Sequence, residues 1–143
     1  MILIGIDPGV QTGLAVSING KLTRVETHGA VSAMREVLHL CQYGLPTGAS
    51  PLVRFEDARK RKWFGSKGPE ALQGAGSIKR DCSIWEEFCE LHKIPFAPIA
   101  PAKGSTKWSD AQFRRLTGWE GRTSEHGRDA ALLVWGAKPR RIE

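Results

Sequence analysis

Residues 2–18 have the sequence ILIGIDPGVQTGLAVSI, from which the predicted fold follows. Apolar residues run up to Asp7, and Pro8-Gly9 turns the chain directly after that carboxylate. The pattern predicts a buried strand over residues 2–7 and a second strand over residues 13–18. Asp is common before such a turn for conformational reasons alone, so Asp7 by itself does not establish a site. A carboxylate at the end of a buried strand is rigidly held, however, which makes Asp7 the first candidate.

The rest of the chain alternates predicted helices and strands. Asn19-Gly20 is a strong signal for a two-residue hairpin turn into a third strand. The further predicted elements are strands at 22–27, 52–56 and 94–99, and helices at 30–42, 69–91, 108–116 and 124–137. Three antiparallel strands followed by helix–strand–helix units predict an α/β fold with a mixed β-sheet flanked by helices. No linker or repeat interrupts the chain, so residues 1–143 are predicted to form a single domain.

Composition limits the possible functions. The chain has 143 residues and three cysteines, an odd number without CxxC spacing, which favours neither a disulfide framework nor a zinc site. It contains no run of about 18 apolar residues, and its N-terminus lacks the features of a signal peptide. A net charge of +6 and an isoelectric point near 9.6 favour a polyanionic partner. These properties predict a cytoplasmic protein with no membrane association.

One segment concentrates the positive charge. Six Lys and Arg residues lie from Arg54 to Lys67, and two large aromatic residues stand among them. A solvated loop is the simplest interpretation of such a run, but exposed aromatic side chains are costly in solubility unless they have a function. Cations that contact phosphates, together with rings that stack on bases, are typical of nucleic-acid binding. The candidate DNA-binding residues here are Arg59, Lys60, Arg61, Lys62, Trp63 and Phe64.

The predicted strand at 52–56 also ends on a carboxylate, Glu56. The last predicted helix carries His126 and Asp129 three residues apart. Residues at this spacing share one helical face, with Cβ atoms about 5–6 Å apart. Singly, each has an ordinary explanation: Glu56 can pair with a neighbouring Arg, and acidic residues are favoured in the first turn of a helix. Three carboxylates converging on one point would repel one another without a cation, and oxygen ligands suit Mg²⁺ or Mn²⁺. The set Asp7, Glu56, His126 and Asp129 therefore predicts a two-metal site that hydrolyses phosphodiesters.

The ordered set resembles the active site of the RuvC-type Holliday-junction resolvases, which belong to the RNase H-like nucleases. IGIDPGVQTGLAV is similar to the opening strand–turn–strand of that family, which has an Asp on the first strand, a Glu ending a later strand and a DxxD or HxxD pair on the closing helix. LQGAGSIKRDC resembles the glycine-containing helix after the Glu strand, and PFAPIAPAKGSTKW resembles the later strand with its basic loop. The resemblance spans nearly the whole chain and is nearer to bacteriophage members than to the bacterial housekeeping enzyme.

This resemblance implies an RNase H-like sheet, a homodimer, two Mg²⁺ ions per site that Mn²⁺ can replace, and paired nicking of four-way DNA junctions in a bacterial or phage-infected cell. It also makes Lys103 and Lys107 candidate contacts to the scissile phosphate. The alternative is that these two lysines contact only other phosphates of the DNA backbone. The family has an aromatic residue soon after the Glu that is thought to stack at the crossover. The three residues after Glu56 contain no aromatic, so Trp63 or Phe64 would have to take that role.

Two other functions fit the same sequence. A YqgF-like RNase acting on ribosomal RNA precursor shares the strand that ends on Asp. A non-catalytic junction-binding protein would have the basic loop but no metal-dependent activity. An actin-like ATPase, which also opens with such a strand, fits poorly because its two-lobed cleft needs far more chain and a second phosphate loop. The sequence therefore predicts no nucleotide cofactor.

Overall fold

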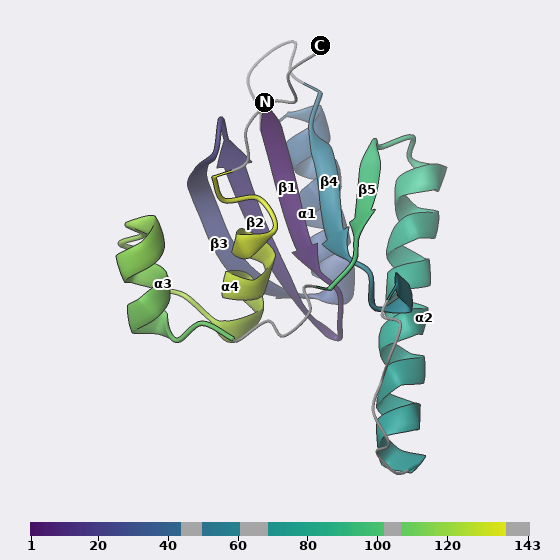
Figure 1. The fold of residues 1–143 in the computed structure, drawn as a ribbon. Coiled ribbons are helices and arrows are strands. Elements are labelled where there is room, and N and C mark those ends of the chain that lie inside the picture. Colours follow the sequence, from purple (N-terminus) through teal and green to yellow (C-terminus); the bar gives the residue numbers. More distant parts are fainter. Residues whose placement is uncertain (44–49, 61–68, 102–106, 137–143) are drawn as a thin grey trace, which may run out of the picture.

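The computed structural model describes residues 1–43, 50–60, 69–101 and 107–136, with the backbone alone described for 69–75. Within them the chain forms a five-stranded sheet in the order β3-β2-β1-β4-β5 (Figure 1). The strands are β1 (Ile2–Asp7), β2 (Gln11–Ile18), β3 (Lys21–Gly29), β4 (Leu52–Glu56) and β5 (Phe96–Ile99). β1, β2 and β3 are antiparallel, whereas β4 pairs parallel to β1 and β5 parallel to β4. The predicted mixed sheet is therefore confirmed.

The β2–β3 turn is the one that the sequence predicts. Asn19 and Gly20 both have positive φ, 51° and 86°. Two adjacent residues with positive φ are what a two-residue hairpin turn of the Asn-Gly kind requires, because its twist then matches that of the strands.

The helices are α1 (Ala30–Gln42), α2 (Pro69–Leu91), α3 (Asp110–Thr117) and α4 (Glu125–Leu132), with a short 3₁₀ turn, η1 (Ala58–Lys60). The ends of α1, β4 and α2 agree with those predicted. α3 begins two residues later than predicted because Ser109 and Gln112 form a capping box, and Gly118 ends the helix with φ 75°.

α4 is shorter than the predicted helix, which runs to residue 137. After Leu132 the backbone tightens: the N–H of Leu133 bonds to the carbonyl of Ala130, and that of Val134 to Ala131. These bonds span three residues rather than four and are typical of a helix end. The apolar periodicity continues through this turn, so it cannot mark where the α-helix ends.

Two hydrophobic cores lie on opposite faces of the sheet. α1 and α2 cover one face, and α3 and α4 cover the other (Figure 1). Alternate residues of β1 divide between the cores: Ile2, Ile4 and Ile6 face α1 and α2, whereas Leu3 packs on the α4 side. By the same alternation Gly5 and Asp7 belong to the α4 face.

α2 extends well past the end of the sheet (Figure 1), and residues 76–80 on it are exposed. No helix in the described part of the chain is long and apolar enough to cross a membrane. The three cysteines, Cys41, Cys82 and Cys89, are free.

Candidate active site

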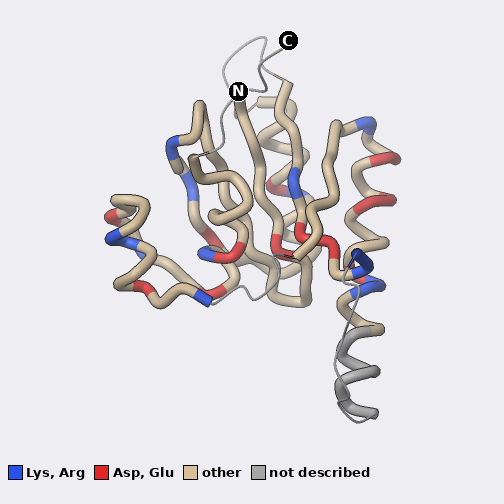
Figure 2. The backbone as a smooth tube through the Cα atoms, viewed as in Figure 1, with Lys and Arg blue, Asp and Glu red and all other residues tan. Residues whose placement is uncertain are grey.

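Asp7 and Glu56 end two neighbouring parallel strands. Ile6 is paired with Phe55 across β1 and β4, so the residue that follows each of them emerges at the same edge of the sheet. Phe55 belongs to the core under α1 and α2, and Glu56, by alternation, belongs to the α4 face together with Asp7. Figure 2 shows acidic positions gathered where β1 and β4 end.

α4 brings the other two predicted residues to this edge. His126 Nδ1 lies 3.1 Å from Asp7 Oδ2, within hydrogen-bond distance. The imidazole is 44% exposed and the Asp7 carboxylate only 18%. The charges of Asp129 and Glu56 both act on Asp7, so the structure brings all four predicted residues within electrostatic reach of one point.

Burial, and to a smaller extent the neighbouring charges, raise the pKa of two of these carboxylates. Burial raises the pKa of Asp7 to about 6, with smaller contributions in the same direction from Asp129 and Glu56, while the hydrogen bond with His126 opposes the shift. Burial also raises the pKa of Asp129, against the attraction of Lys107. A cation between these carboxylates would remove this cost, because it stabilises their charged form.

The donor chemistry fits Mg²⁺ or Mn²⁺, since Asp7, Glu56 and Asp129 would offer oxygen ligands and His126 a nitrogen. Within the described ranges, however, no three His, Cys, Asp or Glu side chains already surround one point closely enough to hold an ion. A metal would thus have to draw the carboxylates of this edge together.

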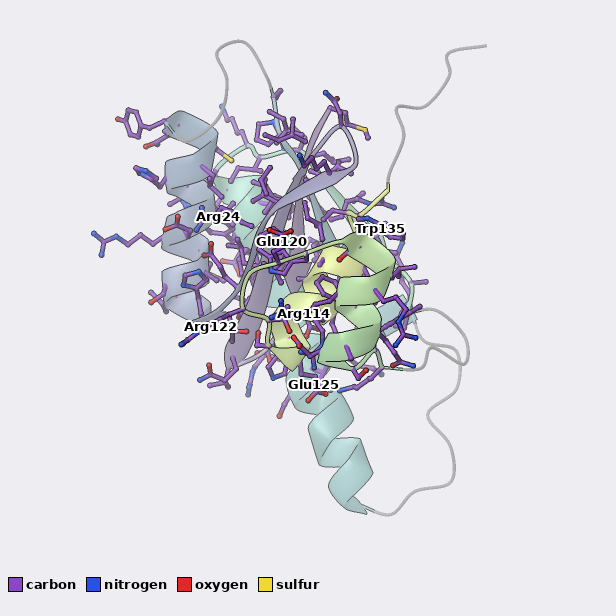
Figure 3. The ribbon with its side chains drawn as sticks, turned by 90° about the vertical axis from the view of Figure 1, so that its left-hand side faces the viewer. Arg24, Arg114, Glu120, Arg122, Glu125 and Trp135 are labelled. Atoms are coloured by element: carbon purple, nitrogen blue, oxygen red, sulfur yellow. The ribbon has the colours of Figure 1, made fainter. Side chains whose placement is uncertain are left out.

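Lys107 lies beside the same edge. Its ammonium group is paired with Glu125, and this pairing is the main reason that the pKa of Lys107 is raised. The charges of Asp129 and Asp7 raise it further, which places the lysine within electrostatic reach of both carboxylates. Glu125 is the first residue of α4, and Figure 3 shows it well apart from Trp135, which follows the other end of that helix. The sequence pattern does not single out Glu125 as a residue of this edge.

The first turn of α4 rests directly on the sheet. Ser124 caps it by accepting the N–H of Gly127, and the hydroxyl of Thr27 on β3 bonds to that of Ser124. At Gly13 a Cβ atom would lie closer than 3.0 Å to the carbonyl oxygen of His126, and a Cβ at Gly5 would meet that of Ala130 in the same way. The sequence pattern does not single out these glycines as site residues, although a glycine within a strand often marks a site where another backbone approaches closely.

Arg59, a predicted DNA contact, is held by two acids. Its guanidinium group donates to Asp57, whose side chain is 2% exposed, and pairs with Glu86 on α2. Arg59 holds the pKa of Asp57 below its usual value. The guanidinium therefore fastens η1 to α2, and its contact with DNA stays a prediction. Lys60, next to it, is exposed and donates to the carbonyl of Pro98.

Several predicted DNA-binding residues lie outside the described residues, namely Arg61, Lys62, Trp63, Phe64 and Lys103. Phe113 is buried in the core on the α4 side, and Trp108 and Trp119 pack against it, so these aromatic residues have a structural role.

Comparison with known proteins does not identify a family. No family model matches the chain. A search of curated proteins also finds no match.

Proposed function

We propose that this chain is a metal-dependent, structure-selective endonuclease that nicks four-way or other branched DNA junctions, with an RNase H-like fold of the RuvC type. The observation that supports the proposal most is the convergence of Asp7, Glu56 and Asp129 with His126 at one edge of the sheet. Strand order β3-β2-β1-β4-β5, with the antiparallel strands first, agrees with the architecture that the resemblance implies.

In this proposal the three carboxylates hold two Mg²⁺ ions, for which Mn²⁺ can substitute. When bound, such ions activate a water molecule and stabilise the leaving oxygen of a phosphodiester. Asp7 is the central ligand, because the charges of both other acids act on it and its carboxylate is bonded to the imidazole. His126 is either a further ligand or the group that orients the attacking water and accepts its proton, and its 44% exposure leaves the ring open to solvent.

In this proposal the basic residues bind the DNA. Lys107, which lies beside the carboxylates, contacts the scissile phosphate, and Lys60 contacts a duplex arm together with the basic residues that follow it in the sequence. Two symmetric nicks in one junction need two active sites, so we propose a homodimer. The compartment would be the cytoplasm of a bacterial cell or of a phage-infected one.

Cleavage of a panel of labelled substrates tests the proposal. A synthetic four-way junction, a linear duplex of the same sequence and a structured RNA are incubated with the protein, with Mg²⁺ or with EDTA. The proposal predicts paired nicks near the crossover of the junction only, and only with Mg²⁺. Preferred cleavage of the RNA would instead support the YqgF-like alternative, and tight junction binding without cleavage would support the non-catalytic one.

A further inference from the structure

The position of α4 relative to Asp7 is set from a single row of residues across the sheet. Asp7 on β1 is directly opposite Gly13 on β2, and Gly13 is directly opposite Thr27 on β3. Directly opposed residues of antiparallel strands present their side chains on the same face. All three positions therefore face α4.

Each of the three meets the first turn of α4 in its own way. Asp7 bonds to the ring of His126, Gly13 leaves room for the His126 carbonyl, and Thr27 bonds to the cap, Ser124. Asp7 and the two residues that support α4, Gly13 and Thr27, therefore lie side by side on three neighbouring strands. Hydrogen-bonded strands lie about 4.8 Å apart, and this spacing varies little.

We infer that Gly13 is a positioning residue for the active site, with Thr27 as its partner: together they fix the height of α4 above the sheet and so the distance from His126 and Asp129 to Asp7. This inference rests on the proposed function for its catalytic consequence, but its geometric part can be measured without metal or substrate.

The geometry at Gly13 allows no side chain. The nearest atoms to an added Cβ are backbone atoms of His126 and Gly127, which cannot rotate away as a flexible side chain can. A methyl group at residue 13 must therefore lift the first turn of α4. The 3.1 Å separation of His126 Nδ1 and Asp7 Oδ2 is near the upper limit for an N–H···O bond, so a small displacement breaks it.

The geometric test uses the four histidine side chains, observed by NMR in the metal-free protein. His126 is assigned by His126→Gln, and its resonance without the Asp7 bond by Asp7→Ala, which leaves no hydrogen-bonding side chain at residue 7. We expect Gly13→Ala to move the His126 resonance toward its position in Asp7→Ala while His28, His39 and His92 stay in place. Gly76→Ala is the matched control, since a Cβ there meets nothing within 4 Å. An unchanged His126 resonance in Gly13→Ala would overturn the inference.

A second pair of variants applies if Gly13→Ala fails to fold. Thr27→Val keeps the shape of the side chain but removes the hydroxyl that bonds to Ser124, whereas Thr27→Ser keeps the hydroxyl. The inference predicts a shifted His126 resonance in Thr27→Val and a resonance near that of the wild type in Thr27→Ser. Equal spectra for these two variants would contradict it.

The catalytic consequence is measured separately. Because a misplacement of about 1 Å can reduce a rate on the order of 10²-fold, we expect Gly13→Ala to lower kcat by that order while the Kd for a four-way junction stays the same. If the His126 resonance shifts but the wild-type protein cleaves nothing, the proposed function fails and the positioning stands. If the wild type cleaves and Gly13→Ala keeps its full kcat, the positioning inference fails alone.

Discussion

His126 Nδ1 reaches Asp7 Oδ2 at 3.1 Å across 119 residues of sequence, and this hydrogen bond joins the closing helix to the first strand. It forms because β1 ends at the point where α4 begins, with the helix backbone seated on glycine. The bond opposes the effect of burial on the Asp7 carboxylate without cancelling it, so the pKa remains about 6. Without a metal, the charged Asp7 carboxylate therefore destabilises the folded protein at neutral pH.

Asp7→Asn should stabilise the metal-free protein. With its pKa raised from 3.8 to about 6, the Asp7 carboxylate destabilises the folded state at any pH above 6, by at most about 3 kcal/mol at 1.36 kcal/mol per unit. This cost shrinks as the pH falls from 6 to 3.8, because the folded state then binds a proton that the unfolded state lacks. Urea unfolding at pH 7.5 and pH 4 should show a gain for the variant at pH 7.5 that has nearly vanished at pH 4. An equal gain at both values would contradict the assigned ionisation.

Arg59→Met should destabilise the protein by about 2 kcal/mol at pH 7, because it leaves the buried charge of Asp57 without its partner. Arg59 lowers the pKa of Asp57, so this contribution is present above the ordinary value of 3.8 and is lost as the pH falls below it. Urea unfolding should therefore show a gap between wild type and variant that narrows below about pH 4. Lys60→Met, which changes the exposed neighbour, is the control, and an equal loss there would argue against the role of Arg59.

Lys107→Met should lower kcat by about 10-fold or more, because a cation beside Asp129 and Asp7 can stabilise charge that develops on the phosphate. Single-turnover cleavage and junction binding, measured on the same variant, separate this role from a simple backbone contact. Lys21→Met, at the opposite end of the sheet, is the control. Weaker junction binding with an unchanged single-turnover rate would show that Lys107 contacts only the DNA backbone and has no part in the chemical step.

Replacing Lys60, Arg61 and Lys62 together with Gln should weaken binding to junction and duplex alike. Each lost phosphate contact reduces the slope of log K against log salt by about 0.9 on duplex arms. Trp63→Ala or Phe64→Ala should instead reduce the preference for junction over duplex, because stacking needs an exposed base. Salt titrations on both substrates provide the comparison, and full junction preference in both aromatic variants would leave the loop a purely electrostatic contact.

Much of this architecture follows from local patterns in the sequence. The apolar run in ILIGID, the Asn19-Gly20 turn and the strand ending on Glu56 each depend on nearby residues, so the strands and their acidic ends are predictable. The convergence of Asp7 with His126 is predictable only as a set, because nothing local to either residue indicates the other.

Other features depend on tertiary contacts that a pattern does not carry. Arg59 lies within a basic run, yet its guanidinium group forms ion pairs with the buried Asp57 and with Glu86 on α2. The end of α4 depends on a tightening of its backbone that the apolar spacing does not reveal. Residue 13 must be glycine because the backbone of α4 packs directly against it, and the sequence does not show which element packs there.

The most direct test of the account is cleavage of a synthetic four-way junction by the wild-type protein and by Asp7→Asn, each with Mg²⁺ and with EDTA. Asp7→Asn is the decisive variant because it removes the central carboxylate while leaving the basic surface intact. We expect paired nicks by the wild type with Mg²⁺ and none with EDTA. We expect no nicks by Asp7→Asn under either condition, together with junction binding at least as tight as that of the wild type. Cleavage by Asp7→Asn at the wild-type rate, or by the wild type in EDTA, would rule out the proposed metal site.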